Sequence, residues 1–550
     1  MAKKKHPRSQ AARARRQPAP PAAAAPADDA APADDAAAAP ARKATSKAAA
    51  AAPAATRPAP RRDRARDRWW FDFDVDRGHL ALLRLAFFGV LAIDAYLQIS
   101  HAPRYGAGDF NVPHFAWLPL PSPSRPLMLG LDVLMTYLFA LAALGVATRI
   151  VVPAGAVLFN YAYFCSQLDS YQHHYLVAML LLIASFVPWD ARDARVRSWA
   201  LRLFTVQIAV LYLWAALAKL DPLWLDGTTL SKQLRPKWIR DLVGSHWALA
   251  SKAVVAGELT LVVAWLWRRL WPLALVIGVG FHVSVELAEF RIGQFSYVMI
   301  AIYTLALPQV VGAAPARWWA RLRARVPVGA PRTERLGGAA AMAVARAAGV
   351  ACLVAAPLDG GAVVVVVIAL VAVGAFALHR RWTVAAAHVA ACALVLWLGH
   401  VTDEPVDYYR LWAGSASRLG HPDEVRAASQ ALVALAPDHP SGNYYLGLQA
   451  LDAGDIDAAL DHFHRAERGN PRSPRVWVGE ARAQIARGDH DAARAALDRA
   501  LAIRPDHAQA RAMLRNLGGT APSRPPGPPA ERATTDPSTA PATDDDSSSE

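Results

Sequence analysis

Cysteine is scarce in this sequence, which has only three in 550 residues: Cys165, Cys352 and Cys392. All three lie inside apolar segments, and none has the spacing of a metal-ligand motif. We interpret them as small hydrophobic core residues. A disulfide framework and a cysteine-ligated metal site are therefore not expected.

The chain also lacks an apolar signal sequence at its start. Residues 1–67 are mostly Ala, Pro and charged residues without apolar periodicity, which predicts a disordered tail. Residues 1–68 hold sixteen Lys and Arg against six Asp, so most of the net charge of +14 lies there. Such a tail can bind anionic lipid or nucleic acid. We favour a solvated cytoplasmic arm that obeys the positive-inside rule, and expect no nucleic-acid partner.

What the sequence has in abundance is apolar residues, at 54% of the chain. This composition is typical of membrane proteins. We expect an all-α fold, a polytopic membrane bundle of about eleven spans followed by a soluble helical-repeat domain. The expected spans lie near residues 80–99, 127–147, 150–168, 173–188, 199–219, 250–267, 270–288, 295–311, 339–357, 361–378 and 383–399.

The distribution of arginine predicts the orientation of these spans. Connections after even-numbered spans are rich in arginine, for example residues 317–335, so they and the N-terminus are expected in the cytoplasm of a cell with an inner membrane. An odd number of spans then places residues after 399 outside the cytoplasm. One connection disagrees, because residues 220–250 are assigned outside but hold Lys232, Arg235, Lys237 and Arg240.

The C-terminal part has an internal repeat of 34 residues. Gly420, Gly454 and Gly488 have this spacing, and so do Pro437, Pro471 and Pro505. The period is that of tetratricopeptide helix pairs, which bind protein or peptide clients. The predicted domains are 1–67 (tail), 68–311 (eight spans), 312–400 (basic loop and three spans), 404–517 (repeats with a capping helix) and 518–550 (disordered tail).

Ionisable residues inside spans are candidates for function, because each is costly in lipid unless it is paired. Lys219 ends the fifth span, just before Leu220-Asp221-Pro222. It can snorkel to the interface, or it can lie neutral in an apolar pocket and accept a proton. Arg84 and Asp94 in the first span are about 15 Å apart along one helix, so each needs another partner.

Three further polar residues lie in later spans. His173 begins the fourth span, Glu258 lies within the sixth, and His282 lies within the seventh, one turn before Glu286. The His282 and Glu286 pair has the i, i+4 spacing of a metal site, but we favour a hydrogen-bonded polar face and expect no metal.

Together these motifs resemble the membrane bundle of vitamin K-dependent gamma-glutamyl carboxylase and the bacterial horizontally transferred transmembrane (HTTM) family. The resemblance covers about residues 68–310. This sequence differs from the animal enzyme at Tyr171-Gln172 and Ala218, and the resemblance ends beyond residue 311. Its elements, in the family's order, are Leu83-Arg84, Asp94, His173, Tyr175-Leu176, Gln207, Lys219-Leu220-Asp221, Trp224, Gly227, His246-Trp247, Glu258-Leu259-Thr260, Phe281-His282 and Phe295-Ser296-Tyr297-Val298-Met299.

This resemblance implies roles for individual residues. By this resemblance Lys219 falls on the family's catalytic lysine, which deprotonates reduced vitamin K. Oxygen then adds to the quinol anion and a strong base is formed. That base removes a gamma proton from a glutamyl side chain, which then takes up carbon dioxide. His173 falls on the family's active-site histidine. The resemblance implies reduced vitamin K or menaquinol with O2 and CO2, and no metal. The expected substrate or quinone pocket holds Arg84, Gln207, Trp224, Glu258 and His282.

Our leading hypothesis is an integral membrane enzyme that oxidises a reduced quinone at Lys219 and carboxylates glutamyl residues of an exported protein. Membrane lipid, a quinone and a protein client of the repeats are the expected partners. The alternative is a non-catalytic membrane scaffold or assembly factor that recruits partners through its repeats. Convergence of Arg84, His173, Lys219 and Glu258 on one pocket would favour the enzyme.

Overall fold

The computed structural model describes residues 68–105, 111–118, 120–168, 172–290, 292–311, 314 and 382–518. The expected N-terminal tail, the two expected spans near 339–357 and 361–378, and nearly all of the expected C-terminal tail lie outside these residues.

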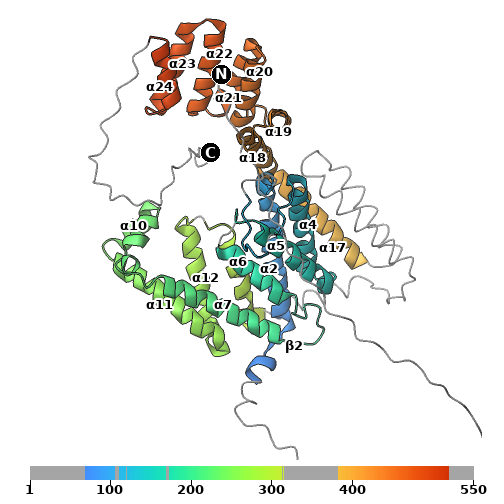
Figure 1. The fold of residues 1–550 in the computed structure, drawn as a ribbon. Helices are drawn as coiled ribbons and strands as arrows, with labels where there is room; N and C mark the ends of the chain where they lie inside the picture. Colours follow the sequence, from blue (N-terminus) through green and yellow to red (C-terminus); the bar gives the residue numbers. More distant parts are fainter. Residues whose placement is uncertain are drawn as a thin grey trace, which may run out of the picture. The chain divides into compact units, whose positions relative to one another are not determined.

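Helices dominate the described membrane part (Figure 1). Each apolar run that predicted a span here has folded as a helix, since a helix satisfies its own backbone hydrogen bonds in lipid. Their bounds are α2 (Arg77–Leu97), which continues through η1 (Gln98–His101) into α3 (Ala102–Tyr105), then α4 (Arg125–Leu144), α5 (Thr148–Cys165), α6 (Gln172–Ala184), α7 (Trp199–Ala218), α11 (Trp247–Leu266), η3 (Arg268–Leu270), α12 (Trp271–Leu287), α13 (Phe295–Ile302), η4 (Tyr303–Ala306) and α17 (Trp382–Val401).

The expected count of eleven spans is not supported. Among the described residues five helices are long and apolar enough to cross a membrane, or six if the bent pair of α17 and the following helix is one span. The 13 residues of α6 reach only about 20 Å at 1.5 Å per residue. The eight residues of α13 are followed by a 3-10 turn. The helix α5 carries Arg149, Pro153 and Asn160, which lower its apolar character.

The core of the membrane part is built around α2, which packs most extensively against α4. Phe87 and Phe88 of α2 are fully buried. The ring of Phe87 lies 5.6 Å from that of Phe204 on α7, and Phe88 lies 5.2 Å from Trp189 and 6.2 Å from Phe139 on α4. Aromatic contacts of this kind add to the burial of apolar area and fix the helices against one another.

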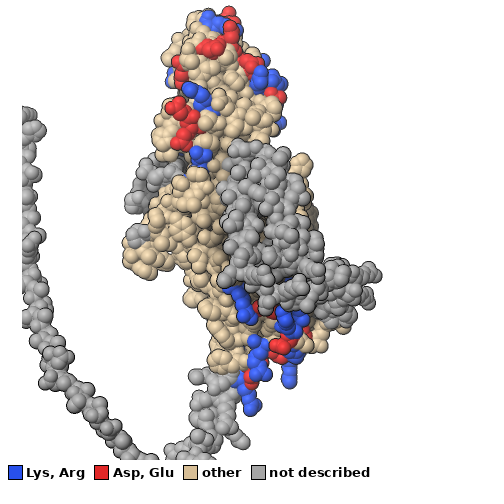
Figure 2. Space-filling view, turned by 90° about the vertical axis from the view of Figure 1, so that its right-hand side faces the viewer, with Lys and Arg blue, Asp and Glu red and all other residues tan. Residues whose placement is uncertain are grey.

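A small charged cluster lies where the first described helix begins. Strand β1 (Asp74–Asp76) pairs antiparallel with β2 (Arg195–Arg197). Asp74 accepts hydrogen bonds from Arg195 at 2.9 Å and from Arg268 at 3.1 Å, and these lower the pKa of its carboxyl group below the usual value. Figure 2 shows charged residues at the lower end of this face and over the repeats at its upper end, while the described surface visible between them is uncharged, as expected for a protein embedded in lipid.

Three short helices connect α7 to α11: α8 (Pro222–Leu225), α9 (Thr228–Gln233) and α10 (Lys237–Val243). Asp221 caps α8 by accepting from the backbone N–H of Leu223 at 2.8 Å, so the Asp-Pro pair both ends α7 and starts the next helix. Gly227 has φ +89°, and a side chain there would collide with the backbone of Trp247. The connection is therefore held closely against α11.

The C-terminal residues form three helix pairs and a final single helix, as predicted. The pairs are α18 (Glu404–Leu419) with α19 (Pro422–Leu435), α20 (Pro440–Asp452) with α21 (Ile456–Gly469), and α22 (Pro474–Arg487) with α23 (His490–Ile503), followed by α24 (Ala508–Asn516). Gly420, Gly454 and Gly488 all have positive φ, which explains the glycine spacing of 34 residues. Gly447 and Gly479 both approach Phe463, which packs at the centre of the middle repeat.

The first repeat helix packs against the membrane part. Helix α18 contacts η1 and α3, and Tyr408 and Tyr409 are buried in the same core as α2. Arg125, at the start of α4, donates a hydrogen bond to the hydroxyl of Tyr408 at 3.2 Å and lies 3.3 Å above the ring of Trp412. The repeats are thus joined to the bundle by side-chain contacts as well as by the chain.

Candidate active site

A cavity of about 1090 Å³ lies among η1 and the ends of α2, α6, α7, α11, α12 and α13, and helices α9 and α10 form part of its wall. Most of its lining is apolar, including Leu211, Val254 and Phe281. Its polar residues come from separate helices. This volume is at the upper end of that of pockets that bind small molecules and cofactors.

Lys219 and Glu258 form an ion pair in this cavity. Lys219 is the C-cap of α7, and its Nζ donates to the backbone carbonyl of Ala215 at 3.1 Å and to Oε1 of Glu258 at 2.7 Å. The side chain of Glu258 on α11 is 3% exposed and that of Lys219 is 22% exposed. The ammonium thus turns back over its own helix end, where the helix dipole favours a cation, rather than extending away from the bundle.

Three buried polar atoms along the cavity have no hydrogen-bond partner among the described residues. They are Oε2 of Glu258, Nδ1 of His282 and Nε1 of Trp224. The ring of Trp224 lies 5.5 Å from Nζ of Lys219. Buried polar atoms are normally satisfied, so these three atoms can exchange hydrogen bonds with water or with a bound molecule.

A hydrogen-bonded chain of aromatic residues supports His282. Its Nε2 lies 2.9 Å from the hydroxyl of Tyr212, which lies 2.8 Å from the hydroxyl of Tyr303. His282 is only 1% exposed. When Tyr212 donates to Nε2, the neutral imidazole carries its proton on Nδ1 and offers a donor. Gly278 makes the chain possible, because a Cβ there would lie 1.8 Å from the hydroxyl of Tyr303.

His173 lies at the start of α6 and lines the same cavity. Its ring is 5.9 Å from that of Phe295 and 4.4 Å from that of His174, and the ring of His282 is 5.6 Å from that of Phe295. Phe295 therefore neighbours both histidines. The structure brings His173, Lys219, Trp224, Glu258 and His282 to one cavity.

Two of the predicted pocket residues lie elsewhere. Arg84 donates to the backbone carbonyls of Ala143 at 3.3 Å and Trp189 at 3.1 Å, and it lies against Gly145 at the end of α4. It joins α2 to the end of α4 and to the segment after α6, which is a structural role. Gln207 is half-buried on α7, about 18 Å along the helix from Lys219, and does not line the cavity.

Tyr212 is a cavity residue that the sequence reasoning did not identify. It lies seven residues before Lys219 on α7, which is two turns of one helix face. The i, i+7 spacing from Lys219 could therefore have identified Tyr212 as a residue on the same helix face. Its partners, His282 and Tyr303, come from parts of the chain that are 70 and 91 residues away, and no local pattern could show them.

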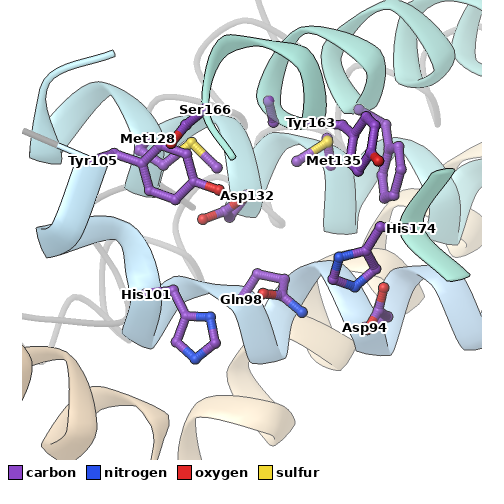
Figure 3. A pocket seen from close by; sticks show the side chains of 12 residues that line it. Asp94, Gln98, His101, Tyr105, Met128, Asp132, Met135, Tyr163, Ser166 and His174 are labelled. Carbon is purple, nitrogen blue, oxygen red and sulfur yellow. The ribbon is translucent and has the colours of Figure 1, made fainter. Parts of the chain in front are cut away.

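A second, smaller cavity of about 50 Å³ adjoins the first. The two share Asp94, Gln98, His101 and His174, and Asp132 of α4 and Tyr105 line the smaller one. Figure 3 shows Asp94 with His174 beside it, Gln98 and His101 further along the same stretch, and Asp132 opposite. Among the residues that the structure describes, no group of three or more His, Cys, Asp or Glu side chains is arranged to hold a metal ion.

Two family models match this chain. The HTTM domain matches residues 74–309, which include every residue that lines the larger cavity, and a tetratricopeptide repeat model matches residues 450–517. The apolar helices and the HTTM domain indicate a membrane protein, and the repeats indicate protein partners. The chain therefore carries an HTTM domain at residues 74–309 and a tetratricopeptide repeat region at residues 450–517.

Proposed function

We propose that this protein is a membrane enzyme that oxidises a reduced quinone in the larger cavity and couples this to carboxylation of a glutamyl side chain. The observation that carries the proposal is the Lys219 and Glu258 pair inside a large, mostly apolar cavity. The HTTM match supports the proposal through a relationship to a vitamin K-related membrane family.

The cavity fits a reduced quinone by its chemistry. A hydroquinone has a flat ring, an apolar tail and two hydroxyl groups. The unpartnered atoms of Glu258, His282 and Trp224 can accept from or donate to those hydroxyls, and the apolar lining suits the ring and tail. Oxidation of the bound hydroquinone by O2 would supply the strong base that removes the glutamyl proton.

Lys219 and Glu258 act as one proton acceptor in this proposal. The pair shares one proton, which lies either on Lys219, as ammonium and carboxylate, or on Glu258, as amine and carboxylic acid. In both forms it can take one proton from a hydroxyl group, which leaves an ammonium and a carboxylic acid. The carbonyl of Ala215 stabilises the ammonium, and the apolar walls exclude the water that would quench a strong base.

The overall reaction balances without a further oxidant. Hydroquinone and O2 give the quinone epoxide and water, while a glutamyl C–H and CO2 give gamma-carboxyglutamate. We assign His173 to the glutamyl side of the cavity on the family resemblance. The quinone is either vitamin K or a menaquinone in its reduced form, and the protein lies in the inner membrane with its repeats outside the cytoplasm.

Mass spectrometry of extracytoplasmic proteins tests the carboxylation directly. We expect gamma-carboxyglutamate in cells with the wild-type protein and none with Lys219→Met. Equal amounts in both, or none in either, would contradict the proposed product.

A protein-recruiting role is the second candidate, and the tetratricopeptide match favours it. Since α18 packs against η1, which also lines the cavity, a client bound by the repeats would be held next to the site. Without catalysis the protein would be a membrane scaffold. In that case Lys219→Met would leave co-purifying proteins unchanged and alter no chemical product.

A further inference from the structure

The segment from Asp221 to His246, which contains α8, α9 and α10, has a charge that the proposed orientation does not explain. Lys232, Arg235, Lys237 and Arg240 lie in it, on the side that the positive-inside rule leaves poor in such residues. All four side chains are exposed. Exposed cations at the level of the membrane surface can bind the phosphates of anionic lipid.

One face of this segment is held by the protein. Leu230 and Leu234 are buried together with Ala288, and Ile239, Trp224 and Trp247 pack against them. Leu234, Ile239 and Val243 also line the larger cavity. The segment is therefore a wall of the cavity and not a loose loop.

The other apolar side of α10, formed by Trp238 and Leu242, also lines the edge of the larger cavity but is mostly exposed. Successive residues of a helix are 100° apart, so Trp238 and Leu242 lie next to Ile239 and Val243 on one apolar face, and Lys237, Arg240 and Asp241 lie opposite. Trp238 is 57% exposed and Leu242 is 79% exposed. An exposed tryptophan and leucine beside basic residues are typical of a helix that lies in the membrane interface.

Few of the basic residues are neutralised within the protein. Lys237 pairs with Asp241 at 2.7 Å, and Asp221 and Asp226 accept from backbone N–H groups at the starts of α8 and α9. Within the part of the chain that the structure describes, Arg235 and Arg240 form no ion pair. Their guanidinium groups are available to phosphate oxygens.

We propose that this segment is an interfacial lid that rests on anionic phospholipid headgroups, with Trp238 and Leu242 inserted among the acyl chains. The charge complementarity of Arg235 and Arg240 selects acidic phospholipid as the occupant of this surface. Because the same helix lines the cavity, the lid places the cavity mouth at the level of the bilayer, where an amphiphile enters without crossing water. The inference depends on the membrane location and not on the proposed reaction.

The immersion of position 242 tests this placement. The full chain, with Cys165, Cys352 and Cys392 replaced by alanine, is reconstituted in lipid nanodiscs and given a nitroxide label at Leu242→Cys. Matched labels at Val276→Cys, 72% exposed on the apolar helix α12, and at Asp491→Cys in the repeats serve as lipid and water controls. Collision rates with O2 and with a water-soluble nickel chelate are measured by power saturation.

We expect the label at 242 to favour O2 over the nickel chelate, as at 276 and opposite to 491. Preference for the nickel chelate, as at 491, would overturn the proposal. Shielding from both reagents would show that protein and not lipid covers this position, and would also overturn the proposal.

The headgroup requirement is tested by lipid composition. In phosphatidylcholine discs with added phosphatidylglycerol, we expect the nickel collision rate at 242 to fall severalfold relative to phosphatidylcholine alone. The double variant Arg235→Gln with Arg240→Gln should abolish that difference, and Lys237→Gln, whose charge is already paired, should keep most of it. No response of the wild-type residues to phosphatidylglycerol would contradict anionic recognition.

Discussion

At the scale of single residues, the proposed function depends on the position of one ammonium group, that of Lys219. From its sequence, Lys219 could either snorkel to the interface or act as a base, because its partner was not visible. Glu258 lies 39 residues away on another helix, and their contact of 2.7 Å exists only through the packing of α7 on α11. Burial of Glu258 makes this contact strong and its loss costly.

The pair should therefore show strong coupling in a double-mutant cycle. We expect Lys219→Met alone to destabilise the protein by about 3–5 kcal/mol, since it leaves a buried carboxylate without a cation. Lys219→Met combined with Glu258→Leu should recover most of that loss, because both charges are gone. Thermal unfolding in detergent measures this, and additive losses in the double variant would disprove the coupling.

A glycine in the cavity wall gives a second prediction. Gly278→Ala should destabilise the protein by about 1–3 kcal/mol, because the new methyl group collides with the buried Tyr303 ring that holds Tyr212 and His282. Gly280→Ala is the matched control on the same helix, since its Cβ meets nothing within 4 Å. Equal unfolding temperatures for the two variants would refute this account of the chain of aromatic hydroxyls.

At the scale of helices, the sequence predicted where the helices lie along the chain better than how long each helix is. All nine expected spans within the described residues are helical, because apolar runs in lipid have no other way to satisfy their backbone. An apolar run does not show whether a helix crosses the bilayer or stops within the bundle. For this reason α6 and α13 were counted as spans, although they are too short.

The repeats could be predicted in more detail, since each 34-residue period contains a glycine whose positive φ the helix turn requires. Gly488 has φ +88°, and a Cβ at this position would meet no atom within 4 Å, so the cost of alanine there is conformational alone. We expect Gly488→Ala to destabilise by about 1–2 kcal/mol. Gly414→Ala, inside α18 and free of close contacts, should instead stabilise by about 0.5–1 kcal/mol.

These two variants are compared by thermal unfolding monitored in the full-length protein. A stabilising effect of Gly488→Ala would show that the left-handed cap is not what sets the 34-residue spacing.

At the scale of the whole molecule, the cavity and the repeats share a wall. Gln98 and His101 of η1 line the cavity, and the same turn packs against α18. The sequence separates these parts by about 300 residues, so only the structure shows their proximity. The converse holds for Arg84. Its place in the sequence motif predicted a pocket residue, but in the structure its side chain joins α2 to the end of α4 and to the segment after α6.

The attachment of the repeats to the bundle should depend on Arg125. Arg125→Ala removes the hydrogen bond to Tyr408 and the contact with the Trp412 ring, worth about 1–2 kcal/mol together. We expect severalfold faster proteolysis at residues 402–403, between α17 and α18. Arg426→Ala, which removes only a long surface ion pair with Asp423, is the control and should cleave at the wild-type rate.

Quinone epoxide formation with purified protein, reduced quinone and O2 shows whether Lys219 starts quinone chemistry in this cavity. We expect epoxide from the wild-type protein and a loss of at least about 100-fold in rate for Lys219→Met, as expected when a general base is removed. The folded double variant with Glu258→Leu should be equally inactive, which separates chemistry from stability. Epoxide formation at the wild-type rate in either variant would contradict the account.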